Sequence, residues 1–255
     1  MIVLINGSTC GVTYSFLRKS HPNGCFDAFD GLLQNGEAKL FWWAKCVDKL
    51  NFWESINPFK VFGTYQIDKK YIKTMSAQNK LGEFLGIQRP KIIIAHSVGC
   101  EYLLEYLANY KPKGRSENKT KRNSLEQIKF ENQFQNQKQD KIKSQNNQKG
   151  LENLEFIYLL QSDCVAKKLD LTEFINIKIS KTKKVQIYNY FCPFDTALIF
   201  SVMTNLRIPD GLFGSQNLDL QNRFVFLNDI SNLHATMPKS TKFANKITKK
   251  LKNLD

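Results

Sequence analysis

The sequence predicts an α/β domain with a mainly parallel sheet of about six strands flanked by helices. Short apolar runs rich in β-formers alternate along the chain with stretches whose apolar residues recur at helical spacing. The run Ile92–Ala95 is wholly apolar, which is typical of a strand buried on both faces of a parallel sheet. The chain has 255 residues, 42% of them hydrophobic, enough for a domain with its own core. We therefore expect residues 1–255 to form a single domain.

The N-terminal part of the chain contains two expected strands and one expected helix. The first strand is Ile2–Ile5, which ends in Asn-Gly, and a weaker strand is expected at Lys60–Thr64. Apolar residues at roughly helical spacing predict a helix over Asp68–Leu85, closed by Gly86 and Pro90.

A strand, a helix and three further strands are expected after residue 91. Cys100, Leu103, Leu104 and Leu107 predict the apolar face of a helix that follows the strand at Ile92–Ala95. The further strands are expected at Leu154–Leu160, Val185–Tyr190 and Phe224–Leu227.

Aromatic residues are concentrated between Phe26 and Phe59, a segment that contains Trp42, Trp43 and Trp53. Their density favours a core helix packed on the sheet. The alternative is an apolar wall for an acyl group, because loops after the carboxyl ends of parallel strands build the pocket.

The net charge of +14 is concentrated in two segments. Residues 111–150 hold 11 basic and 4 acidic side chains, and residues 239–255 hold 6 and 1. The first segment has few apolar residues and many Asn and Gln, so we expect a mobile insertion or a solvated helix. In this topology both segments lie away from the carboxyl edge of the sheet. We expect them to serve solubility, docking or location, and neither a lid nor substrate selection.

Composition excludes several classes of protein. There is no signal-peptide pattern and no apolar run long enough to span a membrane, so a cytoplasmic location is expected. The six cysteines are scattered, which indicates reduced thiols acting as small hydrophobes and neither a disulfide framework nor a metal site. No nucleotide-binding glycine motif occurs, and no cofactor is expected. Nucleic acid is not an expected partner, because no aromatic stacking platform accompanies the lysines.

The segment Ala95-His96-Ser97-Val98-Gly99 joins the strand at Ile92–Ala95 to the helix that follows. A small-x-Ser-x-Gly turn in this context predicts a nucleophile elbow, in which Ser97 is exposed at the start of the helix. The free N–H groups there favour a developing oxyanion. The alternative is a serine that caps the helix.

A nucleophilic serine needs a base and an orienting acid, which in this order of elements follow it in the chain. His21 precedes the serine and His96 lies within the turn, which leaves His234 as the base. Asp195 is the favoured acid because it follows the strand Val185–Tyr190, although it could instead cap the next helix. Asp163 is the competing acid, and Asp229 is third.

Two backbone N–H groups are expected to form the oxyanion hole. One belongs to Val98, directly after the nucleophile, and the other to Ser8 or Thr9 in the turn that follows the first strand. Glycine-flanked turns after strands are common, so the second position is less specific than the first.

These motifs together resemble the α/β-hydrolase superfamily, and within it an uncharacterised bacterial family of esterase/lipase-like proteins. The similar segments are Tyr65–Asp68, Ala95–Gly99, Asp195–Ser201 and, more loosely, Asp229–Ser231. The resemblance implies Ser97, Asp195 and His234 as the triad. The chain departs from the family in two ways, because the usual leading strands are missing and Val98 replaces a frequent Met.

The sequence therefore predicts a serine hydrolase that cleaves a carboxylic ester or thioester of a small-molecule or acyl-chain substrate. Acyl transfer and peptide hydrolysis use the same triad and remain open. The alternative is a hydrolase-like scaffold that binds an acidic protein or an anionic membrane surface through residues 111–150.

Overall fold

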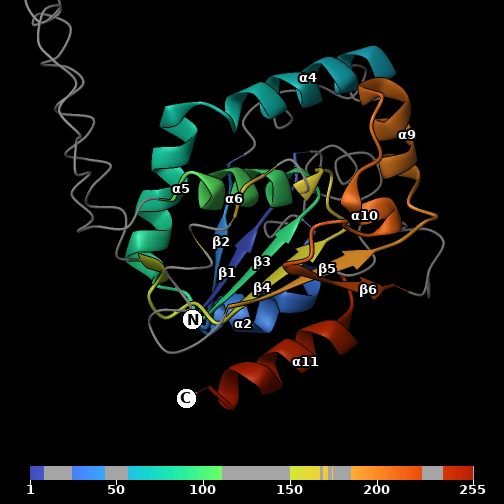
Figure 1. The fold of residues 1–255 in the computed structure, drawn as a ribbon. Coiled ribbons are helices and arrows are strands. Elements are labelled where there is room, and N and C mark those ends of the chain that lie inside the picture. Colours follow the sequence, from blue (N-terminus) through green and yellow to red (C-terminus); the bar gives the residue numbers. More distant parts are fainter. Residues whose placement is uncertain are drawn as a thin grey trace, which may run out of the picture.

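A six-stranded, all-parallel β-sheet forms the centre of the computed structural model, which describes residues 1–8, 25–43, 57–110, 150–166, 169–171, 174, 185–225 and 238–254 (Figure 1). The strand order is β2-β1-β3-β4-β5-β6, so β2 is the edge strand beside β1, and β3 to β6 follow in sequence on the other side of β1. The strands are β1 (Ile2–Ile5), β2 (Ala38–Phe41), β3 (Ile92–His96), β4 (Phe156–Leu160), β5 (Gln186–Phe191) and β6 (Leu220–Phe224).

Helices cover both faces of this sheet, which gives three layers (Figure 1). The helices of the described residues are η1 (Asp27–Phe29), α2 (Asp30–Gln34), α4 (Pro58–Tyr71), α5 (Met75–Gln88), α6 (Val98–Ala108), α9 (Thr196–Asn205), α10 (Asp210–Phe213) and α11 (Thr241–Lys252).

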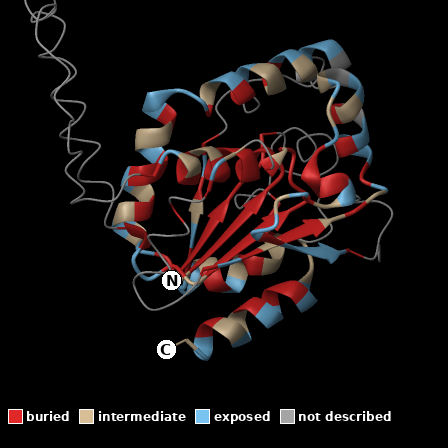
Figure 2. Ribbon diagram, viewed as in Figure 1, coloured by how far each residue is buried: buried red, intermediate tan, exposed pale blue. Residues whose placement is uncertain are grey.

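Alternation along the strands divides the core in two. Ile93 and Ala95 of β3 face α5 and α6, whereas Ile92 and Ile94 face the layer that contains η1, α2 and α11. Because both faces are covered, the inner strands β1, β3 and β4 are buried along their whole length (Figure 2). The same alternation places Val3 and Ile5 of β1 in the first cluster and Ile2 and Leu4 in the second.

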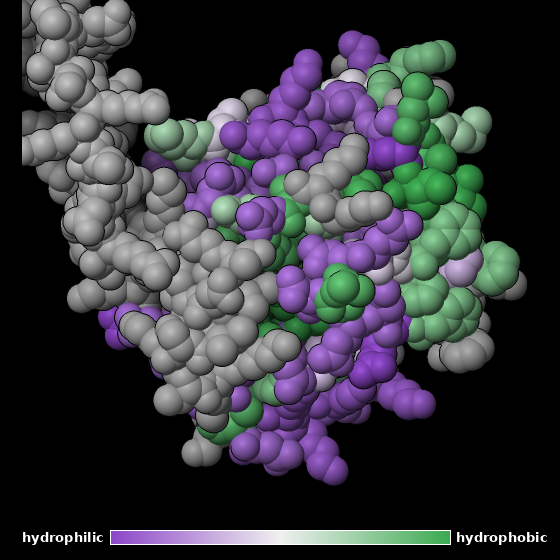
Figure 3. Space-filling view, in the orientation of Figure 1, coloured by the Kyte–Doolittle hydropathy of each residue, from purple (hydrophilic) through white to green (hydrophobic). Residues whose placement is uncertain are grey.

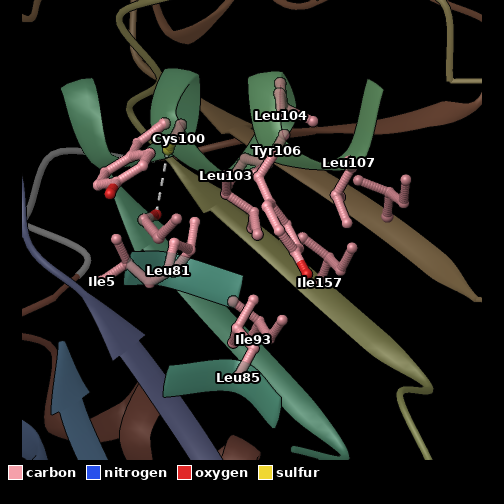
Figure 4. Close-up of a cluster of buried hydrophobic side chains, with 14 of the residues drawn as sticks. Ile5, Leu81, Leu85, Ile93, Cys100, Leu103, Leu104, Tyr106, Leu107 and Ile157 are labelled. Atoms are coloured by element: carbon pink, nitrogen blue, oxygen red, sulfur yellow. Dashed lines mark hydrogen bonds between the residues drawn. The ribbon is translucent and has the colours of Figure 1, made fainter. Parts of the chain in front are cut away.

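Helix α6 is buried along most of its length, because it packs on the middle of the sheet beside α5. Leu103 and Leu107 meet Ile93 and Ile157 of the sheet in one cluster, with Leu81 of α5 (Figure 4). The thiol of Cys100 donates to the carbonyl of Ala95 at 3.2 Å, which the dashed line in Figure 4 marks. This packing fixes the axis of α6 relative to β3, and hence the turn between them.

The structure confirms the fold class and the expected strands β1, β3, β4 and β5, and it corrects the region between β2 and β3. Residues Lys60–Thr64 are not a strand but part of α4. Asn57 caps this helix, accepting hydrogen bonds from the Phe59 and Lys60 N–H groups, and a proline occupies the first turn. The helix expected at Asp68–Leu85 is two helices, because Thr74 caps a new one.

The aromatic segment and the last strand also differ from expectation. Strand β2, with Phe41, stands where a core helix was expected, and Trp43 just beyond it is buried. The last strand is β6, which ends at Phe224, where the expected strand begins. Trp53 and the insertion, except for Gly150, lie outside the described residues.

Helix α9 carries an exposed apolar face at the side of the molecule where β5 ends (Figure 3). Ile199, Met203 and Leu206 follow one another at helical spacing, and Met203 is 73% exposed. Phe213 and Phe224 are also exposed nearby. None of the helices within the described ranges combines the length and apolarity needed to cross a membrane.

Candidate active site

The turn between β3 and α6 holds Ser97 in a strained backbone conformation. Ser97 has φ 54° and ψ −126°, which non-glycine residues rarely adopt. Among the described groups its side chain makes no capping hydrogen bond to α6, although it occupies the N-cap position. The Ser97 N–H donates to the carbonyl of Leu160 at 3.0 Å, and the Ser97 carbonyl accepts from the Cys100 N–H at 3.0 Å. Hydrogen bonds of both the N–H and the carbonyl of Ser97 therefore stabilise its strained backbone conformation.

Close backbone packing explains the small residues around this turn. A Cβ added to Gly99 would lie 2.4 Å from the carbonyl oxygen of Asn6, so only glycine fits there. A Cβ added to Gly7 would lie 2.8 Å from Cβ of Ser97. The turn after β1 thus packs closely against the elbow, and Ser97 is only 5% exposed. The expectation of an exposed serine is therefore wrong.

The turn after β1 also brings Ser8 to this edge of the sheet. Ile5 pairs with Ala95, so the residues that follow each strand are neighbours. Ser8 is buried, and its hydroxyl has no hydrogen-bond partner among the described residues. Val98 is the first residue of α6, where N–H groups lack partners within the helix. Thr9 lies outside the described residues.

Asp195 lies one strand beyond β4, at the same edge of the sheet. It follows β5, is fully buried, and caps α9 by accepting the Leu198 N–H at 3.0 Å. Its other carboxylate oxygen accepts a hydrogen bond from the side-chain amide of Gln161 at 2.7 Å. The predicted helix cap is thus present, and the two oxygens have different partners. His234 and Asp229 lie outside the described residues.

Asp163 has a different environment. Its carboxylate accepts hydrogen bonds from the hydroxyls of Tyr65 and, at 2.8 Å, Ser201, and lies 3.3 Å from the Arg207 guanidinium. Burial and the negative charge of Asp163 raise the pKa of Tyr65, so this phenol is a neutral donor. Asp163 therefore ties α4 to the end of α9.

A buried cluster of charges continues from Asp163 to α6. The ammonium of Lys69 lies 2.5 Å from Glu101, donates to the Asp163 carbonyl at 3.1 Å, and is almost fully buried. Lys73 and Arg207 also lie within 3.5 Å of Glu101. Three cations thus surround Glu101, one turn along α6 from the serine.

Replacing Lys69 with Met is expected to lower the free energy of unfolding by about 3 kcal/mol, because it leaves buried carboxylates with less compensation. The matched variant Lys73→Met removes a cation that is 56% exposed and also pairs with Glu101, and should cost less than about 1 kcal/mol. Urea unfolding of both variants measures the difference. Equal losses would mean that the burial of Lys69 adds nothing to its pairing.

His96 and the four cysteines within the described residues are buried. His96 points away from the α6 face, with its Nδ1 atom 3.4 Å from the Cys25 sulfur. Burial raises the pKa of the thiols of Cys100, Cys164 and Cys192, which keeps them protonated and inert. No group of three or more potential ligand side chains able to hold a metal ion occurs in the part of the chain that the structure describes. His21 falls outside that part.

Sequence reasoning missed Gln161, Lys69 and Arg207 as residues near this site. One signal was present: Gln-Ser-Asp directly follows the apolar strand β4, where carboxyl ends of parallel strands carry function. Comparison with family models, with curated proteins and with solved structures finds no significant match to this chain.

Proposed function

We propose that this protein is a serine hydrolase, which cleaves a carboxylic ester or thioester of a small-molecule or acyl-chain substrate. The observation that carries the proposal is the backbone of Ser97, at φ 54° and ψ −126° between a buried strand and a helix. A nucleophile elbow needs this strained turn, whereas a serine that only caps a helix does not.

In the proposed mechanism the Ser97 hydroxyl attacks the carbonyl carbon and passes its proton to His234. The histidine then gives the proton to the leaving alcohol or thiol, and an acyl-enzyme remains. Water, deprotonated by the same histidine, releases the acid. Asp195 orients the histidine and stabilises its charged form.

Asp195 is preferred over Asp163 as the orienting acid because of their different hydrogen bonds. The carboxylate of Asp163 is engaged by Tyr65, Ser201 and Arg207, which together hold α4 to α9. Asp195 stands after β5, the next strand beyond β4, as a triad acid in this chain order requires.

The oxyanion would be held by the N–H of Val98 and by a second donor from the turn after β1. Besides the N–H group expected from the sequence, Ser8 offers its hydroxyl, which is buried and has no partner among the described residues, and this supports Ser8 as the second donor. A buried donor without a partner costs about 1–3 kcal/mol, and a substrate oxygen would recover part of that cost.

Labelling of the folded protein with a fluorophosphonate, followed by peptide mass spectrometry, tests this function. One adduct per chain is expected, on Ser97, because only an activated serine reacts quickly. Three other buried serines provide internal comparisons: Ser8 and Ser162 follow β1 and β4, and Ser201 lies in α9 and donates to Asp163. A folded protein that stays unlabelled, or an adduct on one of these three serines, would contradict the proposal.

A further inference from the structure

Gln161 makes a side-chain hydrogen bond to the proposed catalytic acid. The residue is fully buried, and its Nε2 atom donates to Oδ2 of Asp195 at 2.7 Å. An ionised carboxylate has no proton to give, so the amide must present its N–H group to it. With Leu198 N–H on Oδ1, both oxygens of Asp195 are fixed by donors from different elements.

The backbone around Gln161 makes hydrogen bonds both to Ser97 and to β5, the strand that leads to Asp195. On one side, the Leu160 carbonyl accepts the Ser97 N–H at 3.0 Å, and the Asp163 N–H donates to the Ser97 carbonyl at 3.3 Å. On the other side, the Gln161 N–H donates to the carbonyl of Tyr190 in β5 at 2.9 Å. One short segment after β4 therefore contacts both the nucleophile turn and the strand that leads to the acid.

This segment adopts a conformation that its sequence does not favour. Gln161 has φ 47°, a left-handed conformation that costs a residue with a Cβ about 1 kcal/mol and that Gly or Asn adopts more readily. Gly211 of α10 packs so tightly here that a Cβ would lie 2.2 Å from the Ser162 nitrogen. The surrounding structure therefore imposes the conformation, while the long amide side chain is what reaches Asp195.

We propose that Gln161 is a positioning residue, which fixes the plane of the Asp195 carboxylate and thereby the histidine that Asp195 orients. This inference rests on the proposed function, because it assigns Gln161 a role only through Asp195. A carboxylate oxygen can accept two hydrogen bonds, so the bonds from Gln161 and Leu198 are compatible with a third from an imidazole. Loss of this support lets the carboxylate rotate, and small displacements of catalytic groups reduce rates strongly.

The central test replaces Gln161 with Met, which has a similar length but no N–H donor. We expect kcat for a p-nitrophenyl ester to fall about 10-fold to 100-fold, with KM changed by less than about 2-fold. Gln161→Asn, which suits the left-handed backbone but is one methylene shorter, should show the same loss in kcat. Retention of wild-type kcat by either variant, with the fold intact by near-ultraviolet circular dichroism, would overturn the inference.

A double-mutant cycle separates positioning from a general structural role. In the Asp195→Asn background, Gln161→Met should change the rate constant of fluorophosphonate labelling by less than about 2-fold, because the carboxylate that Gln161 positions is already gone. Equal losses in both backgrounds would show that Gln161 acts without Asp195. Where Gln161→Met does not fold, Gln161→Gly takes its place in the cycle, because glycine accepts φ 47°.

The two proposals fail in distinguishable ways. Labelling and turnover that survive Ser97→Ala would contradict the serine hydrolase itself. If Ser97→Ala abolishes both, but the effects of Gln161→Met and Asp195→Asn on the labelling rate are additive in the double variant, only the role of Gln161 is wrong.

Discussion

Replacing Ser97 with Ala is expected to lower kcat for ester hydrolysis by about 10⁶-fold, because the reaction loses its nucleophile and hence the acyl-enzyme route. The residual rate should stay above that in water, since the oxyanion donors and substrate binding remain. Hydrolysis of a p-nitrophenyl ester by stopped assays over hours measures both rates.

A second variant at the same position tests whether the inactivity of Ser97→Ala is caused by unfolding. Ser97→Gly removes the hydroxyl and also the strain, because glycine accepts the positive φ of 54°. It should be as inactive as Ser97→Ala, yet at least as stable in thermal unfolding. An inactive alanine variant beside an active glycine variant would show that the hydroxyl is not the nucleophile.

Asp195→Asn is expected to lower kcat by about 10⁴-fold while α9 keeps its N-terminal cap. Asparagine caps helices about as well as aspartate, so α9 keeps its cap, but the amide cannot stabilise the charged histidine. Asp163→Asn is the matched comparison. It should lose less than about 10-fold in kcat but more stability, because the buried Lys69 and the partly buried Arg207 lose a charge partner.

Turnover and urea unfolding of the two asparagine variants, side by side, decide between the two acids. If Asp163→Asn is the variant with the large loss in kcat and Asp195→Asn is nearly fully active, the assignment of the acid must be reversed.

Much of the fold could be predicted from the sequence because its strands are local signals. The runs at β1, β3 and β4 are apolar at nearly every position and rich in β-branched and aromatic residues, which is typical of strands covered on both faces. Strand β2, Ala-Lys-Leu-Phe, is too short and has too few apolar residues to be predicted from the sequence. The mistaken strand at Lys60–Thr64 arose from β-branched and aromatic residues, and the cap at Asn57 is the stronger signal.

The parts of the candidate site that depend on tertiary contacts could not be predicted from the sequence. Ser97 and Asp195 could be selected as candidates because each follows the end of an expected strand. By contrast, the role proposed for Gln161 depends on its side chain reaching Asp195, which follows the neighbouring strand β5. Likewise, Lys69 and Glu101 lie on different helices, and no spacing in the sequence indicates that they pair.

The all-parallel sheet has a consequence for how the protein folds. Parallel neighbours require crossovers, and the pairing of Ile2 with Ile92 closes a loop of 90 residues, against 36 for Ile2 with Ala38. Such distant pairings are slow to form, because loop-closure entropy is lost before contacts are gained. The β1–β3 pair is also the one that brings the turn with Gly7 and Ser8 beside Ser97. We therefore expect this most distant strand pair to form late, so that esterase activity returns after the far-ultraviolet circular dichroism signal during refolding.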